Sequence, residues 1–190
     1  MRIVALALAA SLAATSPALA ETYVLDKSHA HIEFSVDHLG FSTTHGSFRE
    51  FDAAISFTPE KVEETSVRFT INAASIDTAW GPRDDHLRGK DFFDVANHPE
   101  ITFESTSVTP TGADTADVTG NLTMIGETRE VTLQATLNRM GPSPFNPDKT
   151  VAGFTVTGEI DRTEFGMNFA APAVGTVIPV RIDLEMSPAQ

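Results

Sequence analysis

Apolar and polar residues alternate strictly along most of the chain, and this alternation limits the fold more than any other feature of the sequence. In residues 31–37, Ile32, Phe34 and Val36 alternate with polar residues. The same pattern returns in the segments 51–57, 67–73, 101–103, 118–124, 131–137, 154–160 and 178–186, and a short strand is expected at 22–25. Because successive side chains of a β-strand point to opposite faces, each segment is predicted to be a half-buried strand. Eight or nine antiparallel strands at regular spacing form either a barrel or a sandwich.

The segments between the strands carry turn-forming residues and are predicted to be short. The predicted connections are a polar loop at 40–46, one helical turn at 59–64, a hairpin turn at 125–128 and a loop with three prolines at 142–147. Phe48 falls outside the apolar phase of the strand at 51–57, so a bulge is expected near Arg49 and Glu50.

Residues 81–103 depart from the strand pattern and combine charged residues with adjacent aromatics. Pro82 suits a first helical position, and Asp84 lies in the first turn, where a carboxylate favours the helix dipole. A short inserted helix is predicted here, with Asp84 expected to pair with Arg88 one turn later. The pair Phe92-Phe93 would give this helix an apolar surface on which to dock.

Residues 1–20 have the organisation of a Sec-type signal peptide. Arg2 supplies the basic start, residues 3–14 form an apolar core, and Ala18-Leu19-Ala20 provides a small-x-small cleavage site. The apolar run is shorter than the ~20 residues that a membrane-spanning helix needs, and no later segment approaches that length. The mature protein, residues 21–190, is therefore predicted to be one domain without an integral membrane span, exported to the periplasm.

Charge and composition narrow the classes of partner. After removal of residues 1–20, twelve Lys and Arg remain against twenty-six Asp and Glu, a formal charge of −14. Nucleic acid is not an expected partner, because phosphate binding draws on clustered basic residues. The chain contains no cysteine, which excludes disulfides, thiol catalysis and thiolate metal sites.

The aromatic residues are thirteen Phe, one Trp and one Tyr. A Phe ring has no polar atom that needs a partner when it is buried. This usage suits an interior of bare hydrocarbon, filled either by the protein itself or by a guest.

No arrangement of residues predicts catalysis or a resident metal. His29 and His31 share one side of a predicted strand, but that side also carries Glu33 and Asp37, so it is interpreted as a solvated face rather than a metal site. The carboxylates at 84–85 diverge on a helix and cannot flank one substrate atom. The chain has no nucleophile elbow, zinc-protease motif, phosphate loop or dinucleotide fingerprint. No catalytic residue and no cofactor are predicted.

One face of the predicted helix is cationic in an otherwise acidic chain. Arg83, His86 and Lys90 fall at i, i+3 and i+7. Such a face could hold an anionic or polar head group, and Arg83 could make a forked contact to phosphate. The alternative is a solvated helix face in which these residues are interspersed with Asp84 and Asp91.

Four segments of the chain resemble the YceI-like proteins, bacterial periplasmic lipocalin-like barrels described as polyisoprenoid-binding. The segments are Ser28–His38 with Gly46–Phe48 after it, Arg83–Phe103, Gly120–Arg129 and Ile160–Met167, and together they span nearly all of the mature chain. The most specific pattern is Arg83–Asp94. The resemblance implies an all-β fold, an eight-stranded antiparallel barrel with one short inserted helix. It further implies an elongated apolar lumen that binds a long isoprenoid or a similar amphipathic lipid, such as a quinone tail or a fatty acid derivative.

The candidate ligand-binding residues follow from the apolar phases of the strands and from the helix. The candidate lumen residues are Phe34, Val36, Phe57, Phe69, Phe103, Leu122, Leu133 and Phe154, and the candidate mouth residues are Arg83, His86, Lys90, Phe92 and Phe93. The expected function is to sequester or carry a long apolar lipid. Three alternatives stay open: a fatty acid or fatty amide carrier, an enzyme that acts on a lipid head group, and an interaction module with a filled lumen. A homodimer formed through edge strands also stays open.

Overall fold

The computed structural model describes residues 21–189, so the predicted signal peptide lies outside the described residues. Within them, eleven strands belong to one sheet. The strands are β1 Glu21–Leu25, β2 His31–His38, β3 Ser42–Phe48, β4 Phe51–Phe57, β5 Ser66–Asn72, β6 Ile76–Asp77, β7 Glu100–Pro110, β8 Thr115–Met124, β9 Glu127–Ser143, β10 Asn146–Asp161 and β11 Val177–Pro188. The helices are α1 Gly81–Arg88 and the 3-10 turns η1 Lys27–His29, η2 Val62–Glu64, η3 Ala73–Ser75 and η4 Arg162–Phe165.

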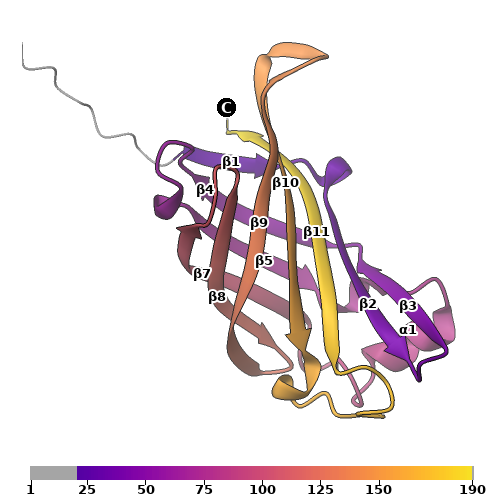
Figure 1. Ribbon diagram of the computed structural model, residues 1–190. Helices are drawn as coiled ribbons and strands as arrows, with labels where there is room; N and C mark the ends of the chain where they lie inside the picture. Colours follow the sequence, from indigo (N-terminus) through magenta and orange to yellow (C-terminus); the bar gives the residue numbers. More distant parts are fainter. Residues whose placement is uncertain (1–20, 190) are drawn as a thin grey trace, which may run out of the picture.

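Eight of these strands close into an antiparallel barrel (Figure 1). They follow one another in the order β1, β4, β5, β7, β8, β9, β10, β11. β11 then returns to β1, with Tyr23 opposite Pro188 and Leu25 opposite Met186. Closure removes the free edges that an open sheet would present. The prediction of an eight-stranded antiparallel barrel is confirmed, and the sandwich alternative is excluded.

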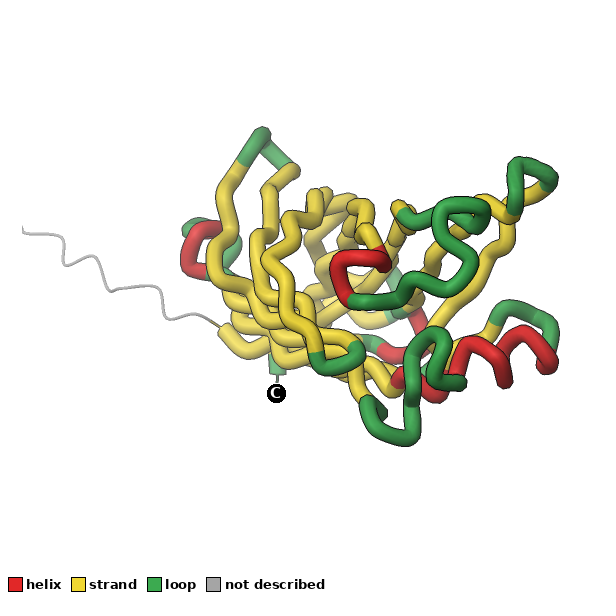
Figure 2. The backbone as a smooth tube through the Cα atoms, turned by 90° about the horizontal axis from the view of Figure 1, so that it is seen from below, coloured by secondary structure: helices red, strands yellow, loops and turns green. Residues whose placement is uncertain are grey.

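Strands β2, β3 and β6 extend the sheet beyond this ring. β11 pairs with β1 near its C-terminal end and with β2 nearer its start, where Val180 lies opposite Phe34. β2 pairs with β3, and β3 pairs with the two-residue strand β6. Because α1 follows shortly after β6, the extension carries the helix beside one end of the barrel, as Figures 1 and 2 show.

The apolar phase of the strands faces the inside of the barrel and forms one hydrophobic cluster. Phe57 packs edge-on against Tyr23 and Phe154, with ring centroids 5.4 and 5.5 Å apart. Such edge-to-face pairs stabilise a core beyond the burial of area alone. The predicted inward phase of the strands at 51–57 and 154–160 is therefore correct.

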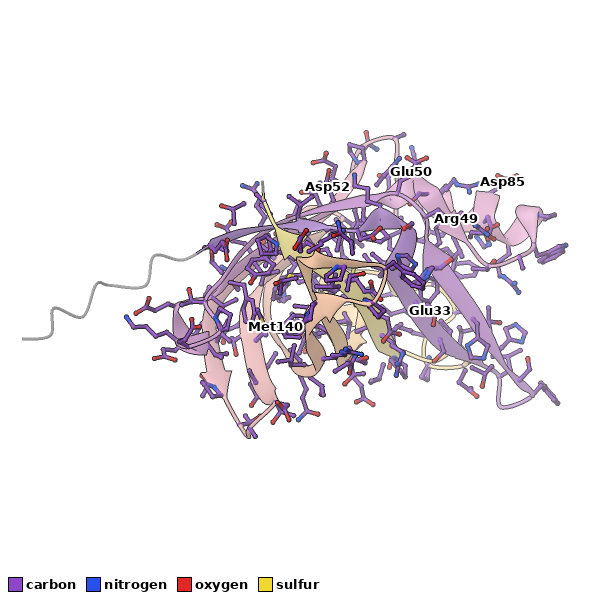
Figure 3. The ribbon with its side chains drawn as sticks, turned by 90° about the horizontal axis from the view of Figure 1, so that it is seen from above. Glu33, Arg49, Glu50, Asp52, Asp85 and Met140 are labelled. Carbon is purple, nitrogen blue, oxygen red and sulfur yellow. The ribbon has the colours of Figure 1, made fainter. Side chains whose placement is uncertain are left out.

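The outer surface carries the acidic residues of the described part of the chain, with the exception of the buried Asp84. Figure 3 shows Glu50, Asp52 and Asp85 directed away from the barrel into solvent. Lys27 donates to Asp52 at 3.0 Å and Asn72 to Glu50 at 2.7 Å. The exposed Lys27–Asp52 ion pair contributes little to stability. Within residues 21–189, no helix has the length and apolar character needed to cross a membrane.

Two predicted loops are wrong. Residues 42–48 form β3, because the backbone pairs with β2 even though Ser42 to His45 are polar and give no alternation. The proline-containing segment 142–147 is mostly strand, since β9 runs to Ser143 and β10 starts at Asn146. The hairpin at 142–147 extends beyond the ring and is largely exposed, and the inward face of β3 carries only Thr44, Gly46 and Phe48, so neither segment has an apolar phase that could be recognised.

The predicted helix and hairpin turn are present. α1 spans Gly81–Arg88 with proline in its first turn. Ile125 and Gly126 alone connect β8 to β9, and both have positive φ, 47° and 80°, as a two-residue turn that follows strand twist requires. The predicted pairing of Asp84 with Arg88 is wrong: the Arg88 guanidinium contacts Asp85 at 3.0 Å.

Candidate functional site

The barrel encloses an apolar cavity of about 460 Å³. Its wall is built from the inward phase of the ring strands other than β1 and of β2 and β3, and is completed by residues of α1 and of the segment 167–174. An eight-stranded barrel is just wide enough either to be filled by its own side chains or to hold a slender guest. Here the side chains leave the interior open.

The eight candidate lumen residues all lie on the wall of this cavity. They are Phe34, Val36, Phe57, Phe69, Phe103, Leu122, Leu133 and Phe154. They come from seven strands, so the alternation of the sequence brings them together from all sides of the barrel. Their contact with a ligand remains a prediction.

The polar residues of the wall gather mostly at one end. Six of the seven lie near α1, namely His38, Thr44, Thr78, Arg83, His86 and Arg162, and Thr65 lies apart from them on the segment before β5. Among the described residues that line the cavity there are two arginines and neither Asp nor Glu. The charged groups on the wall itself are therefore cations, and the carboxylates of Asp84 and Asp91 lie behind it, on Thr78 and His86.

Arg83 is held at the cavity by two hydrogen bonds to one residue. Its Nε donates to the Thr78 hydroxyl at 2.7 Å and its Nη2 to the Thr78 carbonyl at 2.6 Å. The guanidinium also lies 5.7 Å from the centre of the Trp80 ring, within the range of a cation–π contact. A planar guanidinium anchored in this way presents its remaining N–H groups in a fixed direction.

His86 forms the rim of the same end together with two phenylalanines. Its ring packs edge-on against Phe92 and Phe169, each at 5.1 Å, and its Nε2 lies 3.2 Å from Asp91. The Phe169 residue is 47% exposed although it lines the cavity. Side chains that face both the cavity and solvent mark the place where the cavity opens.

The predicted mouth residues are not all brought together. Arg83, His86, Phe92 and Phe93 line the cavity, whereas Lys90 does not. α1 ends at Arg88, so Lys90 lies beyond the helix, exposed to solvent, and does not share a helical face with Arg83 and His86. The prediction of a three-residue cationic helix face is wrong at Lys90.

Arg162 is a second cation on the wall that the sequence analysis missed. It is 4% exposed and donates to the backbone carbonyls of Gly175, Met167 and Val174 at 2.9, 2.5 and 2.9 Å. Burial lowers the pKa of Arg162 from its ordinary value, and the neighbouring Asp161 opposes this effect. The sequence held one indication of this role: Arg162 comes directly after the strand at 154–160 and is followed by a segment with Gly and Pro, whose backbone carbonyls need donors.

Outside the cavity, three residues offer a set of possible metal ligands. Donor atoms of Asp26, His29 and Glu185 lie within 4.8 Å of one another. Asp26 already accepts hydrogen bonds from Ser28 and lies 3.1 Å from the His29 ring. This trio is at the surface near η1 and shares no residue with the cavity wall.

Comparison with known sequences identifies relatives along nearly the whole chain. Residues 23–186 match the YceI-like domain. A UPF0312 protein of Pseudomonas savastanoi pv. phaseolicola is 38% identical over 187 residues, covering 97% of this chain and 94% of the relative. A UPF0312 protein of Pseudomonas aeruginosa is 41% identical over 167 residues, covering 87% and 86%.

Solved structures share the same fold. Burkholderia cenocepacia BcnA superposes with a TM-score of 0.77 at 26% identity, covering 85% of this chain and 98% of its own. The Campylobacter jejuni YCEI protein gives 0.73 at 26% identity, covering 81% and 90%. A polyisoprenoid binding domain from Saccharophagus degradans gives 0.66 at 17% identity, covering 90% and 100%, which is a likeness of fold. The chain belongs to the YceI-like family.

Proposed function

We propose that this protein binds a long apolar lipid, of the polyisoprenoid or isoprenoid-quinone class, inside the barrel and shields its chain from water. The observation that supports this most directly is the unfilled apolar cavity of about 460 Å³. Protein interiors are ordinarily packed with few voids larger than a water molecule. An apolar cavity lowers the stability of the empty protein, and a hydrocarbon guest restores the missing contacts.

Burial of a hydrocarbon chain supplies enough free energy for useful affinity. Each methylene transferred from water contributes about 0.8 kcal/mol, so a ten-carbon segment contributes ~8 kcal/mol before the cost of ordering the chain. No charged anchor is needed for binding. The polar end of the cavity would instead decide which end of the guest enters last.

The cationic end favours a guest whose head group is anionic or accepts hydrogen bonds. Arg83 and Arg162 lie on this part of the wall, and guanidinium groups donate to carboxylate, phosphate and carbonyl oxygens. We therefore expect the head group to lie beside α1 and the chain to lie along the barrel. A fatty acid, with its carboxylate at Arg83, is the second candidate guest for the same reason.

Binding accounts for the site better than the other classes considered from the sequence. The wall provides positioned cations and hydrocarbon but no base paired with a nucleophile among the described lining residues. An interaction module would have a filled interior, which this barrel does not have. The likeness to a polyisoprenoid binding domain supports the choice of guest. The signal-peptide pattern of residues 1–20 supports a periplasmic carrier or store, with 21–190 as the mature domain.

The experiment asks two questions: whether the protein binds a lipid, and whether the lipid lies in the lumen. The protein is purified from the periplasmic fraction of the cells, and one sample is extracted with organic solvent while another is analysed by native mass spectrometry. We expect a co-purifying lipid, and rebinding of an isoprenoid quinone or palmitate after its removal.

A matched pair of variants locates the guest. Val118 lines the cavity, and the next residue, Thr119, lies on the opposite face of β8, where its hydroxyl contacts that of Thr132 at 2.9 Å. Val118→Trp should fill the lumen and abolish binding, whereas Thr119→Trp should leave it intact. Absence of lipid in the extract together with no binding of either probe would overturn the proposal.

A further inference from the structure

Two glycines of the inner wall each face a large side chain of the neighbouring strand. Gly46 on β3 lies directly opposite Phe34 on β2. Gly158 on β10 lies against Leu133 of β9. Phe34 and Leu133 both line the cavity, so the missing Cβ atoms of the two glycines would lie on the inner face of the barrel.

The space of each missing Cβ is occupied by the end of the facing side chain. A Cβ added to Gly46 would lie less than 3.0 Å from three carbons of the Phe34 ring. A Cβ added to Gly158 would lie less than 3.0 Å from a terminal methyl of Leu133. The ring and the isobutyl group therefore rest flat on the glycine backbone, along the wall rather than across the lumen.

Both glycines belong to one row of paired residues that crosses β10, β11, β2 and β3. Gly158 is opposite Val180, Val180 is opposite Phe34, and Phe34 is opposite Gly46. The row thus has a glycine on either side of two larger residues, and combining small with large inner residues is a device by which narrow barrels adjust their interior. Because the two glycines belong to the same row, both act on the part of the wall that this row crosses.

We propose that Gly46 and Gly158 are specificity-determining residues that set the bore of the lumen and admit a methyl-branched chain. This inference rests on the proposed lipid-binding function. An isoprenoid chain carries a methyl branch on every isoprene unit and is thicker than a linear alkyl chain. If either glycine had a Cβ, the ring of Phe34 or the isobutyl group of Leu133 would turn into the open cavity and narrow it.

The same geometry predicts that the protein tolerates these substitutions. The atoms that must move are the far ends of side chains, and the cavity beside them has room. Gly120 differs, because its Cβ would meet the Glu104 carbonyl oxygen at 2.5 Å as well as the Phe103 ring. A substitution at Gly120 would disturb the backbone pairing of β7 and β8, so it is not suited to the test.

The experiment compares two chains of equal main-chain length in Gly46→Ala, Gly158→Ala and wild-type protein. The probes are geranylgeraniol, which is methyl-branched, and hexadecan-1-ol, which is linear, titrated by displacement of a fluorescent naphthylamine. Gly141→Ala is the control, because a Cβ at Gly141 meets nothing within 4 Å. A misfit of methyl-group size in an apolar pocket changes affinity by roughly tenfold or more. We expect that loss for geranylgeraniol in both variants and a change below about twofold for hexadecan-1-ol.

The outcomes separate this inference from the function on which it rests. If wild-type protein binds neither alcohol nor any other lipid probe, the proposed function itself is overturned. If wild-type protein binds both alcohols and the alanine variants bind geranylgeraniol equally well, the assignment of Gly46 and Gly158 is wrong. If a variant fails to fold, the compensated pairs Gly46→Ala/Phe34→Leu and Gly158→Ala/Leu133→Val replace it. These pairs should recover geranylgeraniol binding, and folded pairs that do not recover it would also overturn the inference.

Discussion

The carboxylate of Asp84 accepts hydrogen bonds from both the backbone N–H and the hydroxyl of Thr78, at 2.9 and 2.5 Å. The same hydroxyl accepts from Arg83 Nε at 2.7 Å. Asp84 and Thr78 are both buried, at 7% and 4% exposure. This chain of contacts fixes the first turn of α1 to the residue that follows β6, and so fixes the guanidinium of Arg83 at the cavity.

Replacement of Asp84 should destabilise the fold, although Asp84 does not form the i, i+4 ion pair with Arg88 that its position in the helix suggests. Asp84→Ala leaves the buried N–H of Thr78 without an acceptor, which costs about 1–3 kcal/mol of unfolding free energy. Asp85→Ala is the matched control, since Asp85 is exposed and its pairing with Arg88 contributes less than about 1 kcal/mol. Urea denaturation followed by circular dichroism measures both. Equal effects of the two substitutions would contradict the role given to Asp84.

Replacement of Arg83 should distinguish charged from neutral head groups. Arg83→Gln removes the cation at the polar end of the cavity, so we expect roughly tenfold weaker binding of palmitate and little change for hexadecan-1-ol. Lys90→Gln serves as the control, because Lys90 is exposed and off the cavity wall. Fluorescence displacement titration gives the six affinities of wild type and the two variants for the two ligands. If both alcohol and carboxylate lose affinity equally, Arg83 acts by packing rather than by contact with the head group.

The pair Asp26 and His29 should give the protein a stability optimum in mildly acidic solution. Hydrogen bonds from the Ser28 hydroxyl, and then from His29, lower the pKa of Asp26 from 3.8 to about 2. The stabilisation from Asp26 is therefore present above pH 3.8 and is lost as the pH falls towards 2. The hydrogen bond to Asp26 raises the pKa of His29 above 6.5. The stabilisation from protonated His29 is therefore fully present below pH 6.5 and is lost as the pH rises through the raised pKa.

Asp26→Asn should flatten this pH profile. The carboxylate is partly exposed, with a third of its side-chain surface accessible, so solvent screening limits its contribution to less than about 1 kcal/mol. Urea midpoints measured from pH 2 to pH 8 should show a smaller fall at the acid end for Asp26→Asn than for wild type. Asp148→Asn, on the exposed β9–β10 hairpin, should follow the wild-type profile. A parallel profile for Asp26→Asn would show that the pair does not contribute.

The barrel and its inner wall could be predicted because every ring strand has one buried face. That face selects apolar residues at every second position, as Phe57, Phe69 and Phe103 illustrate. β3 could not be predicted in the same way. Its residues Ser42–His45 lie on a strand outside the ring that buries little apolar surface, so its pairing depends on backbone hydrogen bonds that any sequence can make.

The polar end of the site was less predictable, because its contacts join residues that no local rule connects. The i, i+4 rule favoured Asp84 with Arg88, but the buried N–H of Thr78 is a more demanding partner than an exposed guanidinium. Arg162 donates to backbone carbonyls of an irregular segment. Because every residue has a backbone carbonyl, such an acceptor cannot be recognised from the sequence. Lys90 was misplaced because the helix ends two residues earlier than its charge pattern suggested.

The three carbonyls that surround Arg162 make this side chain the anchor of the segment 167–175. Its guanidinium is buried, and the acceptors at Met167, Val174 and Gly175 come from both ends of that segment. Arg162→Met would keep the length of the side chain but leave the carbonyls to find water, with a loss of at least about 2 kcal/mol. Arg162→Lys tests charge separately, because an ammonium group cannot reach three divergent acceptors in the same geometry.

Hydrogen exchange at the amides of Val174 and Gly175 measures how far the Arg162 substitutions loosen the segment 167–175. The Gly175 amide donates to the Asp37 carbonyl of β2 at 2.9 Å, so it is protected only while the segment is docked, whereas the Val174 amide donates to Ala170 at 2.9 Å and reports on the turn within the segment. We expect faster exchange at both positions in Arg162→Met and in Arg162→Lys, with unchanged exchange in the ring strands at Phe69 and Phe103. Because Phe169 lies on this segment and lines the cavity, the same variants should release bound lipid faster. Faster amide exchange without faster lipid release would mean that the segment does not close the cavity. Amide protection equal to that of wild type would mean that Arg162 does not hold the segment in place.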